Sequence, residues 1–348
     1  MTNRFVGVGI LALLIGSPAH AQSNGGPLDD PLLVVTATNT TDNHLLVYSS
    51  TGTLLKAVPT QGQGGVSGNA GGIAVGHDRL AVVNFGSGTV SVFTQNGADF
   101  ALAQVIPASS SPVSVAFGDD HLYILGTTHV ESHPFDQSGI SETPDGTAAL
   151  VKADGSAAQV GVVVGQLVIS EKSNAIETVN LDAHGAVVGA ATLVANIPAN
   201  VNAPFGLATR GSSAYVTIAH ADEISLVRND QVLTITGSGT QHAPCWVTLD
   251  GPFLFSANSP SKSVSRYSVY GQKIVQDAAV AAQFNGNPTD IAYSAGLAAV
   301  IDSDGTVSHV SVFKVDEDGN LTLRAVATVA NPATNGVAVV RQPSAIGY

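Results

Sequence analysis

The stretch Gly71–Ala108 contains four short runs of apolar and β-branched residues, each bounded by Gly, Asn, Asp or Ser. The runs read GGIAV, LAVVN, TVSVF and FALAQVIPA, and the spacers between them read GHDR, FGSG and TQNGAD. Such runs are typical of β-strands, and such spacers are typical of tight turns. The stretch therefore predicts one antiparallel meander of four strands. The same pattern recurs along the rest of the chain, so this unit constrains the whole fold.

The units recur at a regular spacing of roughly 40 to 47 residues, which is the period of propeller blades. Complete units begin near Gly72, Pro112, Gln159, Pro204, Pro244 and Pro288. Residues 32–60 add three strands before them, and residues 335–342 add one strand after them. Pairing of the last strand with the first three makes a seventh unit and removes the exposed strand edges. We therefore predict an all-β fold, a single seven-bladed β-propeller over residues 22–348. The alternative is another all-β stack, such as a pair of sandwiches or a β-solenoid.

Residues 1–21 have the pattern of a secretory signal peptide. Arg4 supplies a basic start, Val6–Ile15 an apolar core, and Ala19–Ala21 a small-x-small cleavage signal. We expect cleavage before Gln22, export to the periplasm or the extracellular space, and no membrane insertion afterwards. A retained N-terminal anchor is the alternative. No later segment reaches the roughly 20 apolar residues that a transmembrane helix needs.

The composition excludes several function classes. The chain has 13 Lys and Arg against 26 Asp and Glu, a formal charge of −13, so it is a poor partner for nucleic acid or anionic lipid. Cys245 is the only cysteine, so the chain forms no internal disulfide, and we expect a buried, inert thiol. The sequence has no phosphate-binding P-loop, no G-x-S-x-G motif and no C-x-x-C pair. We expect no cofactor.

In a propeller blade, the turn between the second and third strands and the crossover to the next blade lie on the same face. Both sets of loops are rich in small polar residues here, so we expect an axial funnel on that face to bind a small polar ligand or lactone. The candidate ligand-binding residues in these loops are Asn39, Asn84, His129, His242, Asn258 and Asp302. The alternative for Asn84 and Asn258 is a structural role, because Asn side chains often satisfy turn amides.

Glu171 and His220 are the candidate catalytic residues. Glu171 stands where other repeats have Asn, and a residue that breaks a repeat is a good site candidate. A histidine such as His220 can act as a general base near neutral pH, the alternative being a solvated loop residue.

We expect no metal site. His129, Glu131 and His133 share one face of a strand and could meet one ion, but Pro134 indicates an edge or broken strand. The acidic turns at residues 302–305 and 316–320 lack the ligand spacing and the closing Glu of a calcium loop.

Several units resemble the lactonase family of seven-bladed propellers, including LAVVNFGSGTVSVF at 80–93, LVISEKSNAIETVNLD at 167–182 and the crossover IPASSSPVSVAF at 106–117. That family includes propeller-type 6-phosphogluconolactonases and carboxymuconate lactonizing (cyclase) enzymes, and it is related to surface-layer YVTN repeats. A family blade carries an N-E-L-S-x-T-V type segment, and residues 170–174 stand where that segment would. The resemblance therefore implies a role for Glu171 and chemistry that opens or closes a lactone ring.

The charge of the expected funnel limits which ligands it can bind. Phosphorylated and polycarboxylate substrates normally need pairing cations, and the funnel loops offer only Lys172 and Lys262, because Arg210 falls in a turn on the opposite face. The sequence thus predicts an exported lactonase-like propeller that hydrolyses or forms a lactone if it is an enzyme. The alternative is a non-catalytic envelope propeller that binds a protein or glycan partner.

Overall fold

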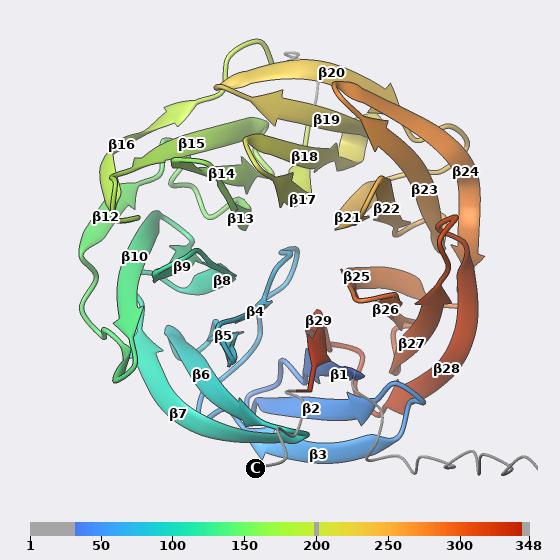
Figure 1. Ribbon diagram of the computed structural model, residues 1–348, viewed down its shortest axis with the longest axis horizontal. Helices are drawn as coiled ribbons and strands as arrows, with labels where there is room; N and C mark the ends of the chain where they lie inside the picture. The colour runs from blue at the N-terminus through green and yellow to red at the C-terminus, as the bar shows by residue number, and fades with distance from the viewer. Residues whose placement is uncertain (1–31, 198–201, 343–348) are drawn as a thin grey trace, which may run out of the picture.

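The computed structural model describes residues 32–197 and 202–342. Seven antiparallel sheets are arranged in a ring around one axis (Figure 1). This confirms the all-β fold and the seven blades predicted from the repeat. The proposed signal peptide of residues 1–21 lies outside the described residues. No helix within the described parts of the chain is long and apolar enough to cross a membrane.

The first blade joins the two ends of the described chain. Its order from the axis outward is β29 (Asn335–Arg341), β1 (Leu32–Ala37), β2 (His44–Ser49) and β3 (Leu54–Pro59). Strand β29 pairs with β1 over almost its full length, with Val339 opposite Val34. The last strand therefore closes the ring, as the strand count predicted.

The other six blades follow in chain order. The second to fourth blades consist of β4 (Ile73–Gly76), β5 (Arg79–Asn84), β6 (Thr89–Asn96) and β7 (Asp99–Pro107); β8 (Pro112–Phe117), β9 (His121–Gly126), β10 (His129–Asp136), β11 (Gly139–Ile140) and β12 (Gly146–Ala149); and β13 (Ala157–Val163), β14 (Gln166–Glu171), β15 (Ala175–Leu181) and β16 (Val187–Leu193).

The fifth blade also contains a single 3₁₀ turn, η1. The fifth to seventh blades consist of β17 (Pro204–Arg210), β18 (Ser213–Ile218), η1 (Ala219–Ala221), β19 (Glu223–Arg228) and β20 (Gln231–Gly237); β21 (Pro244–Asp250), β22 (Phe253–Asn258), β23 (Ser263–Tyr270) and β24 (Lys273–Gln283); and β25 (Asn287–Ser294), β26 (Leu297–Ser303), β27 (Ser308–Val315) and β28 (Leu321–Val329).

The third blade departs from the regular pattern at its outer edge. Two short strands, β11 and β12, pair with different halves of β10 in place of one outer strand. Pro134 lies between the two paired halves, and it has no N–H to donate to a ladder. The irregular tail expected after this blade is therefore a split outer strand.

The core lies between neighbouring blades. In β5, Leu80 and Val82 pack toward the first blade, whereas Ala81 and Val83 pack toward the third. Both faces of a middle strand are buried in this way, which explains why these strands read as continuous apolar runs.

The loops define two faces of the disc. The loops between second and third strands and the crossovers between blades lie on one face, which we call the crossover face. The turns between first and second strands lie on the other, which we call the hairpin face. The inner strands run between the two faces and surround the axis (Figure 1).

Candidate functional site

The glycine-rich segment Gln61–Gly72, between β3 and β4, reaches the axis on the crossover face. Figure 1 shows it as a blue loop that projects into the centre of the ring. Its residue Asn69 donates from Nδ2 to the Val113 carbonyl at 2.6 Å, and its carbonyl accepts the Trp246 indole N–H at 3.0 Å. Ala70 N donates to the Ala158 carbonyl at 3.1 Å. A segment bonded to the third, fourth and sixth blades at once must lie across the axis, and we call Val66–Gly71 the plug.

Glycine makes this path possible. Gly68 and Gly71 have φ of +61° and +64°, a region that side chains with a Cβ rarely occupy. A Cβ at Gly64, where the segment enters, would lie 2.4 Å from the backbone of Asn39. The expectation of an open funnel on the crossover face is therefore wrong, because the chain's own loop fills that end of the axis.

A cavity of about 650 Å³ occupies the axis below the plug. Ala70 and Gly71 line its closed end, and His77 and Asp78, in the β4–β5 turn, line its mouth on the hairpin face. Most of its wall comes from the inner strands of the second, fourth, fifth, sixth, seventh and first blades. Its polar lining includes Gln159, Thr209, Thr248, Asp290, Tyr293 and Arg341. A volume of this size is typical of small-molecule sites.

Asp290 is the buried carboxyl group of this cavity. Its Oδ1 accepts the Ile291 amide at 2.8 Å, and its Oδ2 accepts the Val337 amide of β29 at 3.1 Å. Burial raises the pKa of Asp290 to about 7, although these two hydrogen bonds oppose the shift. Sequence reasoning missed this residue because it examined loops, whereas Asp290 lies within an inner strand.

Asp290 occupies a position that recurs around the axis. It follows a register shift in β25, and Ser114 and Gln159 follow the corresponding shifts in β8 and β13. Ser114 Oγ accepts the Val160 amide at 3.3 Å, and Gln159 Oε1 accepts the Leu207 amide at 2.7 Å. Each side chain thus accepts an N–H from the inner strand of the next blade. Only Asp290 does so with an ionisable group, and this irregularity in the repeat was the signal that could have found it.

Glu171, the main catalytic candidate from the sequence, ends β14 and is fully buried beneath the crossover that precedes β13. Its Oε2 accepts the Ser156 hydroxyl at 2.9 Å, and its Oε1 has no hydrogen-bond partner. Burial raises the pKa of Glu171 to about 8, with further increases from the charges of Glu177 and Asp154. Glu171 does not line the axial cavity.

The neighbouring Lys172 holds the plug. Its Nζ donates to the Gly68 carbonyl at 2.5 Å and to the Ala157 carbonyl at 3.3 Å. Burial lowers the pKa of Lys172, although the charges of Glu171 and Asp154 oppose this. The cation expected to face a ligand therefore binds the protein's own loop.

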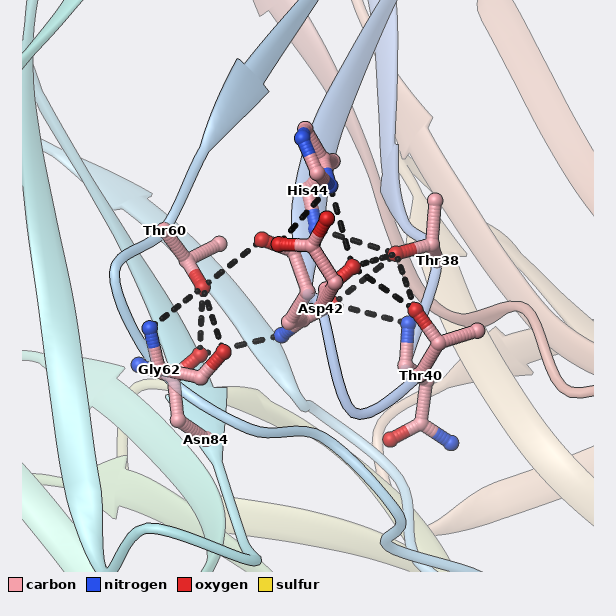
Figure 2. Close-up of polar contacts among 9 residues, drawn as sticks. Thr38, Thr40, Asp42, His44, Thr60, Gly62 and Asn84 are labelled. Atoms are coloured by element: carbon pink, nitrogen blue, oxygen red, sulfur yellow. Dashed lines mark hydrogen bonds and ion pairs between the residues drawn. The ribbon is translucent and has the colours of Figure 1, made fainter.

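Asn84 uses both ends of its side chain within the protein. Its Oδ1 accepts the Thr60 hydroxyl at 2.8 Å and the Asn43 amide group at 3.0 Å. Its Nδ2 donates to Ser91 Oγ at 2.7 Å. Figure 2 shows Asn84 joined to Thr60, where the chain leaves β3 for the glycine-rich segment. Asn258 makes the equivalent bonds in the sixth blade, to Ser263 and Ser265.

Asn39 anchors the plug from the first blade. Its Nδ2 donates to the carbonyls of Val66 and Ala333, and its Oδ1 accepts the amides of Gly65 and Val66. The positive φ of 56° at Asn39 is one that Asn tolerates better than most residues. These contacts place Asn39 beside the start of the plug, and Asn39 does not line the cavity.

Two further loop candidates, His220 and His242, both lie near Asp222. His220 is exposed in η1, and His242 is exposed with its Nδ1 2.8 Å from Asp222 Oδ2. Burial alone would raise the pKa of Asp222, but the hydrogen bonds from His242 and the Ala243 amide outweigh it and lower that pKa.

Asp302 is buried at the end of β26. Its Oδ2 accepts the Gly286 amide at 3.1 Å and lies 3.3 Å from His309 Nδ1. Burial raises the pKa of Asp302, and the nearby His309 opposes the shift.

The His-Glu-His segment is only partly assembled. Glu131 and His133 meet, with Oε2 and Nε2 3.4 Å apart, whereas the Nδ1 of His129 lies 2.8 Å from its neighbour Thr128. Within residues 32–197 and 202–342, no three His, Cys, Asp or Glu side chains are grouped to hold a metal. Burial raises the pKa of the Cys245 thiol to about 12, as expected of an unreactive cysteine.

Fold and cavity together define the class, a seven-bladed β-propeller with an axial pocket open on one face. No family model and no curated protein matches the sequence. Solved structures do match. Proteins of Bacteroides fragilis and Bacteroides uniformis that carry the provisional name 6-phosphogluconolactonase are 13% and 15% identical, each with a TM-score of 0.64. The alignments cover 91% and 90% of this chain and all of the other.

The periplasmic gluconolactonase PpgL of Pseudomonas aeruginosa is 14% identical, with a TM-score of 0.63, and the match covers 90% of this chain and 99% of that one. The resemblance to lactonase-type propellers seen in the sequence is thus confirmed at the level of the fold.

Proposed function

We propose that this protein is a lactonase-like propeller that binds a small, uncharged lactone in its axial cavity and hydrolyses the ring. The observation that carries the proposal is the position of Asp290, a buried carboxyl group with a pKa near 7 in the wall of a 650 Å³ cavity. Ser114 and Gln159 accept the equivalent backbone N–H with neutral groups, so the structural bond alone does not require a carboxylate. Ionisable groups with shifted pKa values in a cavity are typical of functional sites.

The chemistry follows from the pKa. As a carboxylate, Asp290 takes a proton from a water molecule, and the water oxygen bonds to the lactone carbonyl carbon. The ring C–O bond then breaks, and the ring oxygen receives the proton, which leaves a hydroxy acid. Each carboxylate oxygen of Asp290 accepts only one backbone N–H, so a lone pair remains for the water.

The lining also favours an uncharged ring. Among the described residues that line the cavity, Arg341 is the only Lys or Arg. It is the last residue of β29 and lies at the mouth of the cavity. A phosphate group deep in the cavity would have no cation to pair with. The lactones of unphosphorylated sugar acids fit this lining better than their phosphorylated counterparts.

A second candidate function keeps Glu171 and His220 as the proton-transfer pair at the crossover face, with Asn39, Asn84, His129, His242, Asn258 and Asp302 around them. The unpartnered Oε1 of Glu171 favours it, but the plug would have to move first. A third is a binding propeller without catalysis, for a protein or glycan partner. Export, to the periplasm or beyond, is part of the proposal and rests on residues 1–21; PpgL, which shares the fold, is periplasmic.

The test is a panel of sugar lactones assayed with the mature protein. Hydrolysis of gluconolactone above the spontaneous rate should fall at least about 100-fold in Asp290→Asn, the usual size of a general-base effect. In the parent protein kcat/KM should rise with pH through about 7, because only the carboxylate is active. Glu171→Gln should keep its activity. Loss of activity in Glu171→Gln with full activity in Asp290→Asn would favour the crossover-face candidate, and no turnover by the parent protein would favour the binding propeller.

A further inference from the structure

Six of the inner strands carry a register shift near their start, at the crossover end of the axis. The residues that follow the shifts occupy equivalent places in their blades, so they lie at one depth, directly below the plug. We call them the belt: Ser114, Gln159, Leu207, Trp246, Asp290 and Val337. All of them except Ser114 line the axial cavity, and those five come from consecutive blades (Figure 1). The belt is therefore one continuous arc of wall at the closed end.

The side-chain amide of Gln159 is fixed in one orientation within the belt. Its Oε1 accepts the Leu207 N–H at 2.7 Å, and because that N–H needs an oxygen, the NH₂ group takes the other position. A Cβ on Gly71, at the closed end of the cavity, would lie 3.1 Å from Nε2. Nε2 donates to no acceptor in the parts of the chain that the structure describes. Gln159 thus presents free N–H donors at the closed end.

The other donors of the belt are used within the protein. The Trp246 indole N–H binds the Asn69 carbonyl at 3.0 Å. The Ser114 hydroxyl donates to the Gly71 carbonyl at 3.1 Å. Both bonds hold the plug, so neither group is available to a ligand while the plug is in place. Among the belt side chains, the free hydrogen-bond donor is the amide of Gln159.

The remaining polar side chains of the cavity lie nearer its mouth. The hydroxyl-bearing Thr209, Thr248 and Tyr293 stand within the last three residues of their strands, toward the hairpin face. The charged groups of the lining, other than Asp290, belong to the mouth itself. The closed end therefore pairs a neutral donor, Gln159, with a carboxyl group, Asp290, and the Trp246 indole comes from a blade between theirs.

We propose that Gln159 Nε2 donates a hydrogen bond to the carbonyl oxygen of the bound lactone, whose ring lies against Trp246. The inference rests on the proposed function for the identity of the ring. A carbonyl oxygen only accepts hydrogen bonds, so it fits the amide end of the arc and not the carboxylate end. When the water oxygen bonds to the carbonyl carbon, the π electrons of the C=O bond move onto this oxygen. The Nε2–H group stabilises that charge until the electrons return and the ring C–O bond breaks.

The test compares two neutral rings by titration calorimetry. Gluconolactam carries the carbonyl group, and 1,5-anhydroglucitol has a CH₂ group in its place. The parent protein should bind gluconolactam at least about tenfold more tightly. Trp246 is the only tryptophan in the chain, so its fluorescence should change when a ring occupies the belt. Equal affinities, no binding of either ring at millimolar concentration, or binding without a change in fluorescence would overturn the proposal.

Two variants remove the donor in different ways. Gln159→Glu keeps an oxygen for the Leu207 N–H, and Gln159→Ser introduces the residue that accepts the corresponding N–H in the third blade, Ser114. Each should weaken gluconolactam binding at least about tenfold and change 1,5-anhydroglucitol binding less than about twofold. Gln95→Glu, beside Asp78 and the Arg341 carbonyl at the mouth, adds the same charge and should keep the preference. A preference that survives in either Gln159 variant would contradict the assignment.

Turnover is measured separately, so that the two proposals can fail independently. In Gln159→Ser, kcat for gluconolactone should fall at least about 100-fold, the usual size of the effect of one oxyanion donor. Full kcat in this variant would overturn the role of Gln159 and leave the proposed function intact. If the parent protein hydrolyses no lactone, the proposed function fails, and a preference for gluconolactam that depends on Gln159 still supports the carbonyl contact.

Discussion

Asp290 shows how one residue can depart from a repeat without disturbing it. Its carboxyl group makes the same bond to the next blade that the Ser114 hydroxyl and the Gln159 amide make elsewhere in the ring. The fold therefore tolerates an ionisable group at this position, and burial then raises its pKa to about 7. That shift also has a consequence for stability.

Asp290→Asn should stabilise the folded protein above pH 7. Because the folded-state pKa lies above the ordinary value of 3.8, the parent protein loses stability as the pH rises from about 4 to about 7, and the loss is complete above that. The difference between variant and parent should grow to a few kcal/mol, at most on the order of 4 kcal/mol. Urea unfolding at pH 4, 6 and 8 measures it. A difference that is the same at all three pH values would show that the carboxyl group is not buried as described.

Glu171→Gln should change the pH dependence of stability in a higher pH range than Asp290→Asn does. Glu171 has a pKa of about 8, so the folded protein binds its proton at neutral pH and loses stability as the pH rises toward 8. The variant should therefore match the parent at low pH and exceed its stability at pH 9. Thermal unfolding at pH 5 and pH 9 measures this difference in stability between the variant and the parent protein. A variant that is less stable at pH 9 would mean that the charged form has a partner.

At the scale of elements, the plug decides which end of the axis is open. Five blades contribute to its contacts, through Asn39, Val113, Ala158, Trp246 and its own continuation into β4. The four hydrogen-bonded contacts join residues far apart in the sequence, and the Trp246 bond spans 177 residues.

Lys172→Met should loosen the plug without unfolding the blades. The variant loses the Nζ bonds to Gly68 and Ala157 but keeps an aliphatic side chain of similar length. Amide hydrogen exchange over residues 66–71 should become faster, by about tenfold for each 1.4 kcal/mol of lost local stability. Lys262→Met is the matched control, since the Lys262 Nζ donates to the Asn285 carbonyl and not to the plug. Equal exchange rates in the two variants would assign the plug's stability to its other contacts.

The strands could be predicted from the sequence, and the plug could not. Turn residues and apolar runs are local signals, so the unit starts near Pro112, Pro204 and Pro244 coincide with β8, β17 and β21. The glycines of residues 61–72 indicate a loop, but its path depends on distant partners. Asp290 was not predicted as a site residue for a related reason, since only the register shift in β25 places it at the cavity wall. Asn84 and Asn258 were predicted from the sequence either to bind ligand or to have a structural role. Their hydrogen bonds within the protein match the structural role.

At the scale of the molecule, ring closure by β29 holds the disc together. Val337, Val339 and Val340 in this strand are all buried. Each buried valine contributes roughly 1.5 to 3 kcal/mol, so their sum approaches the stability of a whole domain.

A chain that ends at Thr334 should therefore lose cooperative unfolding and aggregate. It would expose β1 as an open strand edge and uncover the apolar side chains of the seventh blade that pack against Val337 and Val339. Calorimetry and size-exclusion chromatography would show this, with a chain that ends at Gln342 as the control. A monomeric truncated protein with a sharp transition would contradict the importance of closure.

Ligand should enter the axis from the hairpin face, because the plug closes the other end. A crystal structure of the protein with gluconolactam, which has the shape of the sugar lactone but resists hydrolysis, tests it most directly. We expect the ring in the axial cavity, beside Asp290 and below Ala70, with the plug in place. A ring bound at the crossover face near Glu171, with the plug displaced, would contradict it.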